Sequence, residues 1–215
     1  MRSMLRSKRG SSACTATIAL LFLLVTTGYT AEMPDTDWLA YFGTDEDNIT
    51  EYRITLISPF GPQQFIQRQK PKGIIEFAGM RYRELVIVHD SGPFANQISK
   101  TFTRVSQDGL YERNEDGNEV MLVPRPLVHG QIWKNGDDIY KFEGIEDFET
   151  FNATILDCAK ITLQSENADE NHKATELMDI KYYERGKGLI YKSGTNGQFS
   201  ITKILSVYAA RTDKP

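Results

Sequence analysis

The amino-acid sequence predicts a mainly β fold, built as a single antiparallel sheet with little helix. Two observations support this prediction. After Tyr41 the chain consists of short segments in which apolar and polar residues alternate, and turn residues separate these segments. The chain also lacks the succession of strands and long helical patterns that is typical of parallel α/β sheets, so we expect antiparallel neighbours.

The alternating segments define the expected strands. In the first of them, Tyr52, Ile54 and Leu56 point to one face of the strand. Arg53 and Thr55 point to the other face, because side chains alternate with a period of two along a strand. The same period recurs at 80–88, 140–142, 178–182 and 199–207. Each segment is therefore expected to bury one apolar face.

Turn residues separate several of these segments. Asp-Gly within 115–118 and Asn-Gly at 135–136 and 196–197 tolerate the positive φ angles that tight hairpins require. Segment 94–105 fits two patterns, since its apolar residues have helical spacing while its β-branched residues favour a strand. We predict a strand there. Segment 165–175 is polar and is predicted to be a surface excursion.

The N-terminus has the layout of a secretion signal. Four arginine or lysine residues precede an apolar segment at 18–25, and small and polar residues follow it. This apolar segment is shorter than the ~20 residues that a membrane-spanning helix needs, so we expect no membrane span in the mature chain. An uncleaved anchor is the alternative to a cleaved signal.

The residues after the apolar segment place cleavage between about residues 28 and 31. We favour cleavage after Gly28, because cleavage after Ala31 would place the bulky Tyr29 at position −3. The expected organisation is a signal peptide at 1–28 and one β-rich domain at 29–215. The protein is expected to be exported, to the periplasm, the cell envelope or the outside of the cell.

Charge and cysteine content limit the function classes. The chain has 25 basic and 29 acidic residues, and loss of the signal leaves 21 basic against 29 acidic residues, a net charge of −8. An acidic domain with dispersed cations is a poor nucleic-acid binder, because phosphate binding needs clustered positive charge. Cys158 is the single mature cysteine, so the core and not an internal disulfide must stabilise the domain.

Several segments carry a family resemblance. Asp108–Tyr111 matches "DGIY", 121–133 matches "PLPL..GD.W", 151–161 matches "PAGTF.DCLKV" and 182–192 matches "YYAPGVGLVK". With these segments in this order, the chain resembles a divergent member of a family of exported bacterial proteins of unknown function. The resemblance implies a strongly curved antiparallel sheet, a half-barrel or open barrel, and it implies no catalytic residue.

The residues themselves assemble no recognisable catalytic or metal site. Cys158 lies in an expected strand and is interpreted as a packing residue. His89, Asp90 and Ser91 are the residue types of a hydrolase triad, but adjacent residues on an extended chain point in opposite directions. The histidines lack metal-ligand spacing. We therefore predict no catalytic residue, no metal site and no cofactor, and an enzyme is the less favoured reading.

The aromatic residues supply the functional hypothesis. Tyrosine and phenylalanine recur on the expected strands, where they can fill the concave side of a curved sheet or line a groove for a ligand. We predict that a groove binds an apolar small molecule, a lipid or an extended peptide, with Trp133 and Tyr182 in its lining. The alternatives are a hydrolase with acidic catalytic residues that the sequence does not single out, and a purely structural interaction module.

Export makes a first testable prediction. Mass spectrometry of the native protein is expected to find a new N-terminus between Thr27 and Glu32, because the small residues after the apolar segment suit signal peptidase. An intact Met1 would contradict cleavage.

Overall fold

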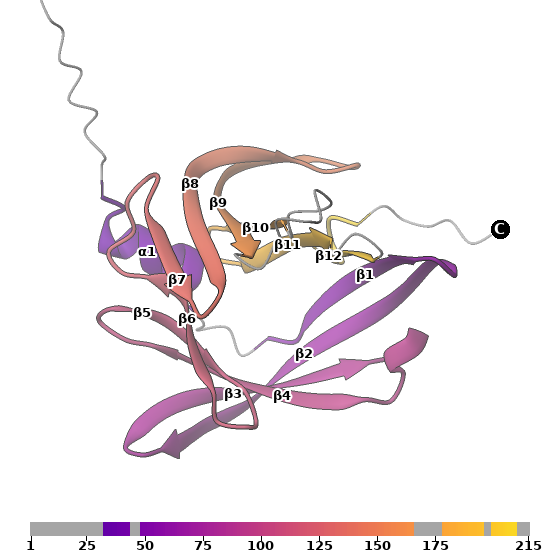
Figure 1. Cartoon of the computed structure of the whole chain (residues 1–215), viewed down its shortest axis with the longest axis horizontal. Coiled ribbons are helices and arrows are strands. Elements are labelled where there is room, and N and C mark those ends of the chain that lie inside the picture. Colours follow the sequence, from indigo (N-terminus) through magenta and orange to yellow (C-terminus); the bar gives the residue numbers. More distant parts are fainter. Residues whose placement is uncertain (1–31, 44–47, 166–177, 196–198, 210–215) are drawn as a thin grey trace, which may run out of the picture.

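Every described strand pairs antiparallel with its neighbours in the sheet (Figure 1). The structure is a computed structural model that describes residues 32–43, 48–165, 178–195 and 199–209. Its elements are α1 (Asp35–Phe42), β1 (Thr50–Ser58), β2 (Gly61–Phe77), β3 (Met80–His89), η1 (Gly92–Phe94), β4 (Ile98–Val105), β5 (Gly109–Arg113), β6 (Glu119–Pro124), β7 (Ile132–Asn135), β8 (Asp138–Glu149), β9 (Thr154–Ser165), β10 (Met178–Glu184), β11 (Gly188–Thr195) and β12 (Ser200–Leu205).

The two edge strands of the sheet, β6 and β7, follow each other in the sequence. The order is β6-β5-β4-β3-β2-β1-β12-β11-β10-β9-β8-β7, so the first described strand pairs with the last one. The sheet curves until β6 and β7 approach each other, and one seam stays open between them (Figure 1). The predicted fold class, a mainly β, strongly curved antiparallel sheet in the form of an open barrel, is confirmed.

The turn predictions agree with the structure where it can test them. Segment 115–118 joins β5 to β6, and Gly136 joins β7 to β8 with a φ of 60°. In segment 94–105 the predicted strand is present as β4, after the short 3-10 helix η1. The predicted signal peptide, the Asn-Gly at 196–197 and most of segment 165–175 lie outside the described residues.

Helix α1 is a finding that the sequence prediction missed. It is only eight residues long, and a helix of this length is marginal without tertiary contacts. Trp38, Tyr41 and Phe42 form its buried stripe, while Asp35 and Asp37 lie in its first turn, where the helix dipole favours negative charge. Packing of the three rings against the sheet therefore explains why this segment is helical.

Hydrogen bonds tie α1 to both halves of the sheet. In one half, the indole N–H of Trp38 donates to the carbonyl oxygen of Pro124 at the end of the edge strand β6, over 2.8 Å. In the other half, the backbone N–H of Gly186, between β10 and β11, donates to the carbonyl oxygen of Ala40 over 2.7 Å. The hydroxyl of Tyr41 donates to the carbonyl oxygen of Asp157 in β9 over 2.6 Å. The helix thus ties the edge strand β6 to the part of the sheet that β9, β10 and β11 form.

The main hydrophobic cluster lies where α1 meets the seam. Trp38 is fully buried, and the cluster extends from it to both edge strands. Its other buried members are Met33, Tyr41, Phe42, Leu110, Val123, Leu127, Trp133, Tyr140, Phe142, Ala159, Ile161 and Tyr183. Burial of these side chains stabilises the curved form, because an apolar side chain contributes about 1.5–3 kcal/mol when it is fully removed from water.

Gly188 is expected to be structural. It begins β11 with a φ of 72°, and an added Cβ would meet only the carbonyl oxygen of Tyr41, at 4.0 Å. Space is therefore available, but β-branched residues are strongly disfavoured at this φ. We expect Gly188→Val to lower the free energy of unfolding by about 1–3 kcal/mol in urea titrations. Gly188→Asn is the control and should lose less, because asparagine tolerates this conformation. An unchanged midpoint for the valine variant would show that the glycine is incidental.

Candidate functional site

The concave side of the sheet contains a cavity of about 360 Å³. Residues of α1, of β1 to β6 and of β10 to β12 line it, so its walls come from both halves of the sheet. A volume of this size is within the range of sites that bind small organic molecules. We therefore take this cavity as the candidate site.

Aromatic rings form a large part of the cavity wall. Tyr41, Phe42, Tyr52 and Tyr183 line it. The hydroxyl of Tyr52 donates to the carbonyl oxygen of Leu189 over 2.9 Å, and the ring centroids of Phe42 and Tyr183 lie 4.9 Å apart. Burial raises the pKa of the Tyr183 phenol, so this ring stays uncharged at neutral pH. The aliphatic part of the wall consists of Leu85, Ile87, Leu110, Leu122 and Leu189.

Three lysines form a row across the same cavity. Lys181 in β10 pairs in register with Lys192 in β11, which pairs in register with Lys203 in β12, and all three line the cavity. The next positions along this row are the apolar Ile161 in β9 and Ile54 in β1. Like charges on directly opposite residues destabilise a sheet. The row therefore costs folding free energy unless other groups compensate its charges.

The central lysine has a carboxylate partner. The ammonium of Lys192 lies 2.8 Å from the carboxylate of Asp179 in β10. Gly194 makes room for this contact, because a Cβ on Gly194 would lie 1.8 Å from a carboxylate oxygen of Asp179. Because Gly194 has no side chain, the carboxylate of Asp179 can lie over β11 and neutralise the charge of Lys192.

The two outer lysines rest on aromatic faces instead. The ammonium of Lys203 lies 4.0 Å from the ring centroid of Tyr52, and that of Lys181 lies 5.2 Å from the ring centroid of Tyr140. Neither lysine forms an ion pair with a carboxylate of the described residues. Burial and the neighbouring Lys192 lower the pKa of Lys203 to about 7 and that of Lys181 to about 8.

The lysine row was not recognised in the sequence, although a signal for it exists. Lys181, Lys192 and Lys203 are equally spaced in the chain, at intervals of eleven residues. Equal spacing through successive antiparallel hairpins places residues side by side only if the strand register fits. The register includes a bulge between Tyr182 and Tyr183, which periodicity does not reveal.

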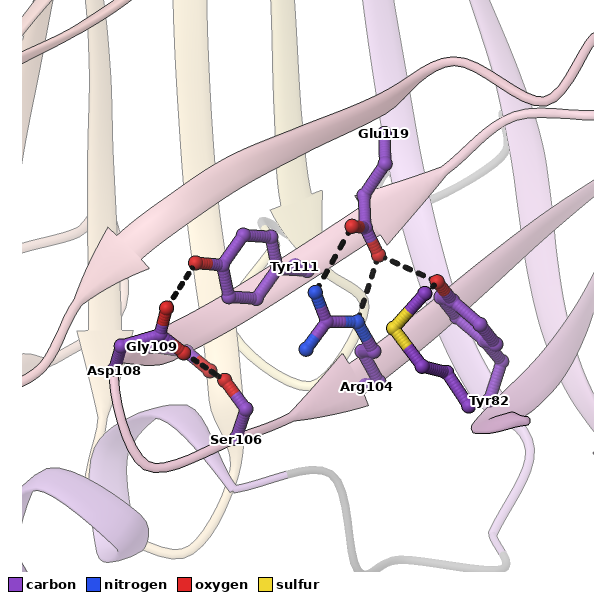
Figure 2. A network of polar contacts seen from close by, with 8 residues as sticks. Tyr82, Arg104, Ser106, Asp108, Gly109, Tyr111 and Glu119 are labelled. Atoms are coloured by element: carbon purple, nitrogen blue, oxygen red, sulfur yellow. Dashed lines mark hydrogen bonds and ion pairs between the residues drawn. The ribbon is translucent and has the colours of Figure 1, made fainter. Parts of the chain in front are cut away.

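The opposite face of β3 to β6 carries a polar network, shown in Figure 2. Arg104 donates to both carboxylate oxygens of Glu119, over 2.7 and 2.9 Å, and Tyr82 donates to the same carboxylate over 2.7 Å. Tyr111 donates to Asp108 over 2.7 Å, and the guanidinium of Arg104 lies 4.0 Å from the Tyr111 ring centroid. The pairing lowers the pKa of Glu119, so it stays charged. We interpret this network as a structural tie between strands.

Trp133 and Tyr182, the predicted ligand contacts, do not line the cavity. Trp133 is buried and stacks on Tyr140 with ring centroids 5.5 Å apart. Tyr182 lies on the other face of β10 from Lys181 and Tyr183, and its hydroxyl donates to Glu146 over 2.7 Å. No bound ligand tests their role, so ligand contact by these two residues stays a prediction.

The other residues singled out in the sequence stay apart. Cys158 is fully buried, and burial raises the pKa of its thiol to about 11, so that the unreactive thiol dominates at neutral pH. The ring of His89 shares a hydrogen bond of 2.9 Å with the amide of Gln67, and Asp90 pairs with Arg68. Within the described ranges, no group of three or more His, Cys, Asp or Glu side chains could hold a metal ion.

Comparisons with known proteins reveal a shared fold. No family model matches the chain, and no curated protein matches it significantly. A candidate exported protein with a YmcC-like fold from Bacteroides fragilis superimposes with a TM-score of 0.50 at 10% identity, covering 77% of this chain and 96% of that chain. A candidate lipoprotein from Parabacteroides distasonis gives a TM-score of 0.40 at 12% identity, covering 77% and 97%. At this low identity, the likeness to the first structure shows a similar fold alone.

The lysine row predicts a pH-dependent change in stability. The folded pKa of Lys203, about 7, lies below its unfolded value, so the cost of charging it is complete below about pH 7 and disappears as the pH rises toward about 10. The charges that act on this ammonium are Lys181, Lys192 and Glu112. Lys203→Met should therefore raise the free energy of unfolding at about pH 6 by about 1 kcal/mol, because the side chain is only half-buried.

Chemical denaturation at about pH 6 and about pH 9 measures this effect. The stabilisation by the methionine should shrink at the higher pH. Lys100→Met, on the opposite face of β4 and exposed, is the matched control and should show no such pH dependence. An identical effect of Lys203→Met at both pH values would contradict the lowered pKa.

Proposed function

We propose that this protein is an exported, non-catalytic domain of the cell envelope that binds an apolar or extended ligand in the concave cavity. The basic and apolar N-terminal segments support export, as does the likeness in fold to a candidate exported protein. Of the helices that the structure describes, none is long and apolar enough to cross a membrane.

One observation carries the binding function. A cavity of about 360 Å³ lies inside the sheet, and tyrosine, phenylalanine and leucine side chains supply much of its wall. Apolar walls with a few polar groups are typical of sites that bind small molecules, because the walls supply affinity and the polar groups fix orientation. The fixed positions of Tyr52 and Tyr183 reduce the entropy lost when a ligand binds.

The hydrolase alternative has less support in this cavity. Hydrolysis by a pair of carboxylates needs two acidic side chains that face the substrate. Among the described residues that line the cavity, Glu112 alone carries a carboxylate. A purely structural module remains the competitor, and it differs from the proposal in that its interior would not admit a ligand.

A neutral fluorescent probe tests the proposal. Nile red is expected to bind the purified protein saturably, with enhanced and blue-shifted emission, because it would transfer from water to the apolar wall. Thr101→Trp projects an indole from β4 into the cavity and should weaken this binding by about tenfold or more, since the ring would occupy part of the limited volume.

Lys100→Trp is the matched control for this substitution. Lys100 precedes Thr101 on β4, points to the opposite face and is exposed, so this tryptophan should leave probe affinity unchanged. Tyr182→Ala in the same titration tests whether that ring also contacts the ligand. If Nile red fails to bind, or binds equally to Thr101→Trp with intact near-UV circular dichroism, the structural module is the better description.

A further inference from the structure

The lysine row places positive charge in a cavity whose neighbouring wall is largely apolar. Lys181, Lys192 and Lys203 occupy one register position on three adjacent strands, with isoleucines on both sides. Charged side chains next to apolar walls are unfavourable without a partner of opposite charge. A ligand with a negative group would supply that partner.

Among the described residues, the two outer lysines of the row are the ones without an ion-pair partner. Lys192 is neutralised by Asp179, whereas Lys181 and Lys203 contact the faces of Tyr140 and Tyr52. An aromatic face attracts a cation through its quadrupole but does not cancel the charge. Both ammonium groups line the cavity and stay able to donate hydrogen bonds to an anion there.

The net charge of the side chains that line the cavity is opposite in sign to the net charge of the whole chain. The protein has a formal net charge of −4, yet five cationic side chains and one acidic side chain are among the described residues that line the cavity. Lys187 at its rim is already paired with Glu184 over 2.7 Å. An acidic protein with a cationic interior disfavours cationic ligands at that site and selects anionic ones.

The charge balance of the row itself favours a singly charged anion. The row faces two carboxylates of the described residues, Asp179 at the central position and Glu112, whose charge acts on both outer lysines. With all three lysines protonated, three positive charges against two negative ones leave one positive charge on the row, and Arg83 also lines the cavity. One carboxylate would neutralise the charge of the row.

We propose that the ligand is a fatty acid, a single-chain amphiphile whose carboxylate lies at the lysine row and whose hydrocarbon chain lies against the aromatic and leucine wall. This inference rests on the proposed function, because it assigns the headgroup of the ligand in the same cavity. Charge-assisted hydrogen bonds from the row fix the head, and the apolar wall holds the chain without specifying it.

Three amphiphiles with the same hydrocarbon chain and different headgroups test the inference. Dodecanoate, dodecanol and dodecyltrimethylammonium, each below its micelle concentration, are titrated against the protein at neutral pH by calorimetry and by displacement of Nile red. Dodecanoate is expected to bind at least about tenfold more tightly than dodecanol, and the ammonium compound most weakly, because only the carboxylate accepts charge-assisted hydrogen bonds as an anion.

Variants assign this preference to the lysines. The double variant Lys181→Met and Lys203→Met should still bind Nile red, while its preference for dodecanoate over dodecanol falls below about threefold. Lys100→Met, on the opposite face of β4, is the control and should keep the preference. Methionine fits an apolar wall, and Lys203→Arg should largely retain the preference because it keeps the charge.

The outcomes separate this inference from the proposed function. Nile red binding with equal affinities for dodecanoate and dodecanol would overturn the fatty-acid assignment and leave the binding function standing. Failure of Nile red and of all three amphiphiles to bind would overturn both. Tighter binding of dodecyl phosphate than of dodecanoate would overturn the singly charged headgroup.

Discussion

The open seam between β6 and β7 is the constraint on which the rest of the structure depends. Edge strands expose unpaired N–H and C=O groups, and a sheet that does not close must satisfy or cover them. Helix α1 contributes to this on the β6 side by bonding to Pro124, and it bonds to Gly186 in the other half of the sheet. The same helix supplies Tyr41 and Phe42 to the cavity wall. Tyr41 also lines a second cavity, of about 430 Å³, so its ring contributes to both spaces.

The strands and the antiparallel class could be predicted from the sequence, because period-two patterns and Asn-Gly or Asp-Gly turns act locally. The strong curvature was implied by the family resemblance alone. The sequence did not predict which face of the sheet is concave. In β3 the period of two separates two faces without telling which of them is concave. Arg83, Leu85 and Ile87 line the cavity, whereas Tyr82 lies on the other face, where Phe77 and Arg104 contact its ring.

The candidate site was predicted only in outline. An aromatic groove was expected, and Tyr41, Phe42, Tyr52 and Tyr183 do line the cavity. Tyr182, one residue away from Tyr183, points to the opposite face, because adjacent strand residues alternate. The lysine row depends on the register of three strands, and α1 depends on tertiary packing. Neither property is encoded in a local pattern, so single-sequence reasoning misses both.

The pairing of β1 with β12 has a consequence for the order in which the chain can fold. The strands β1 to β6 and β7 to β12 are two runs of local hairpins, and this single ladder joins them, for example through Tyr52 and Leu205. Until the last strand is available, β1 remains an unprotected edge that can pair with another chain. Lys203 also arrives with that strand, so the cavity acquires its full charge only in the final, long-range step, which is the slow kind of contact to form.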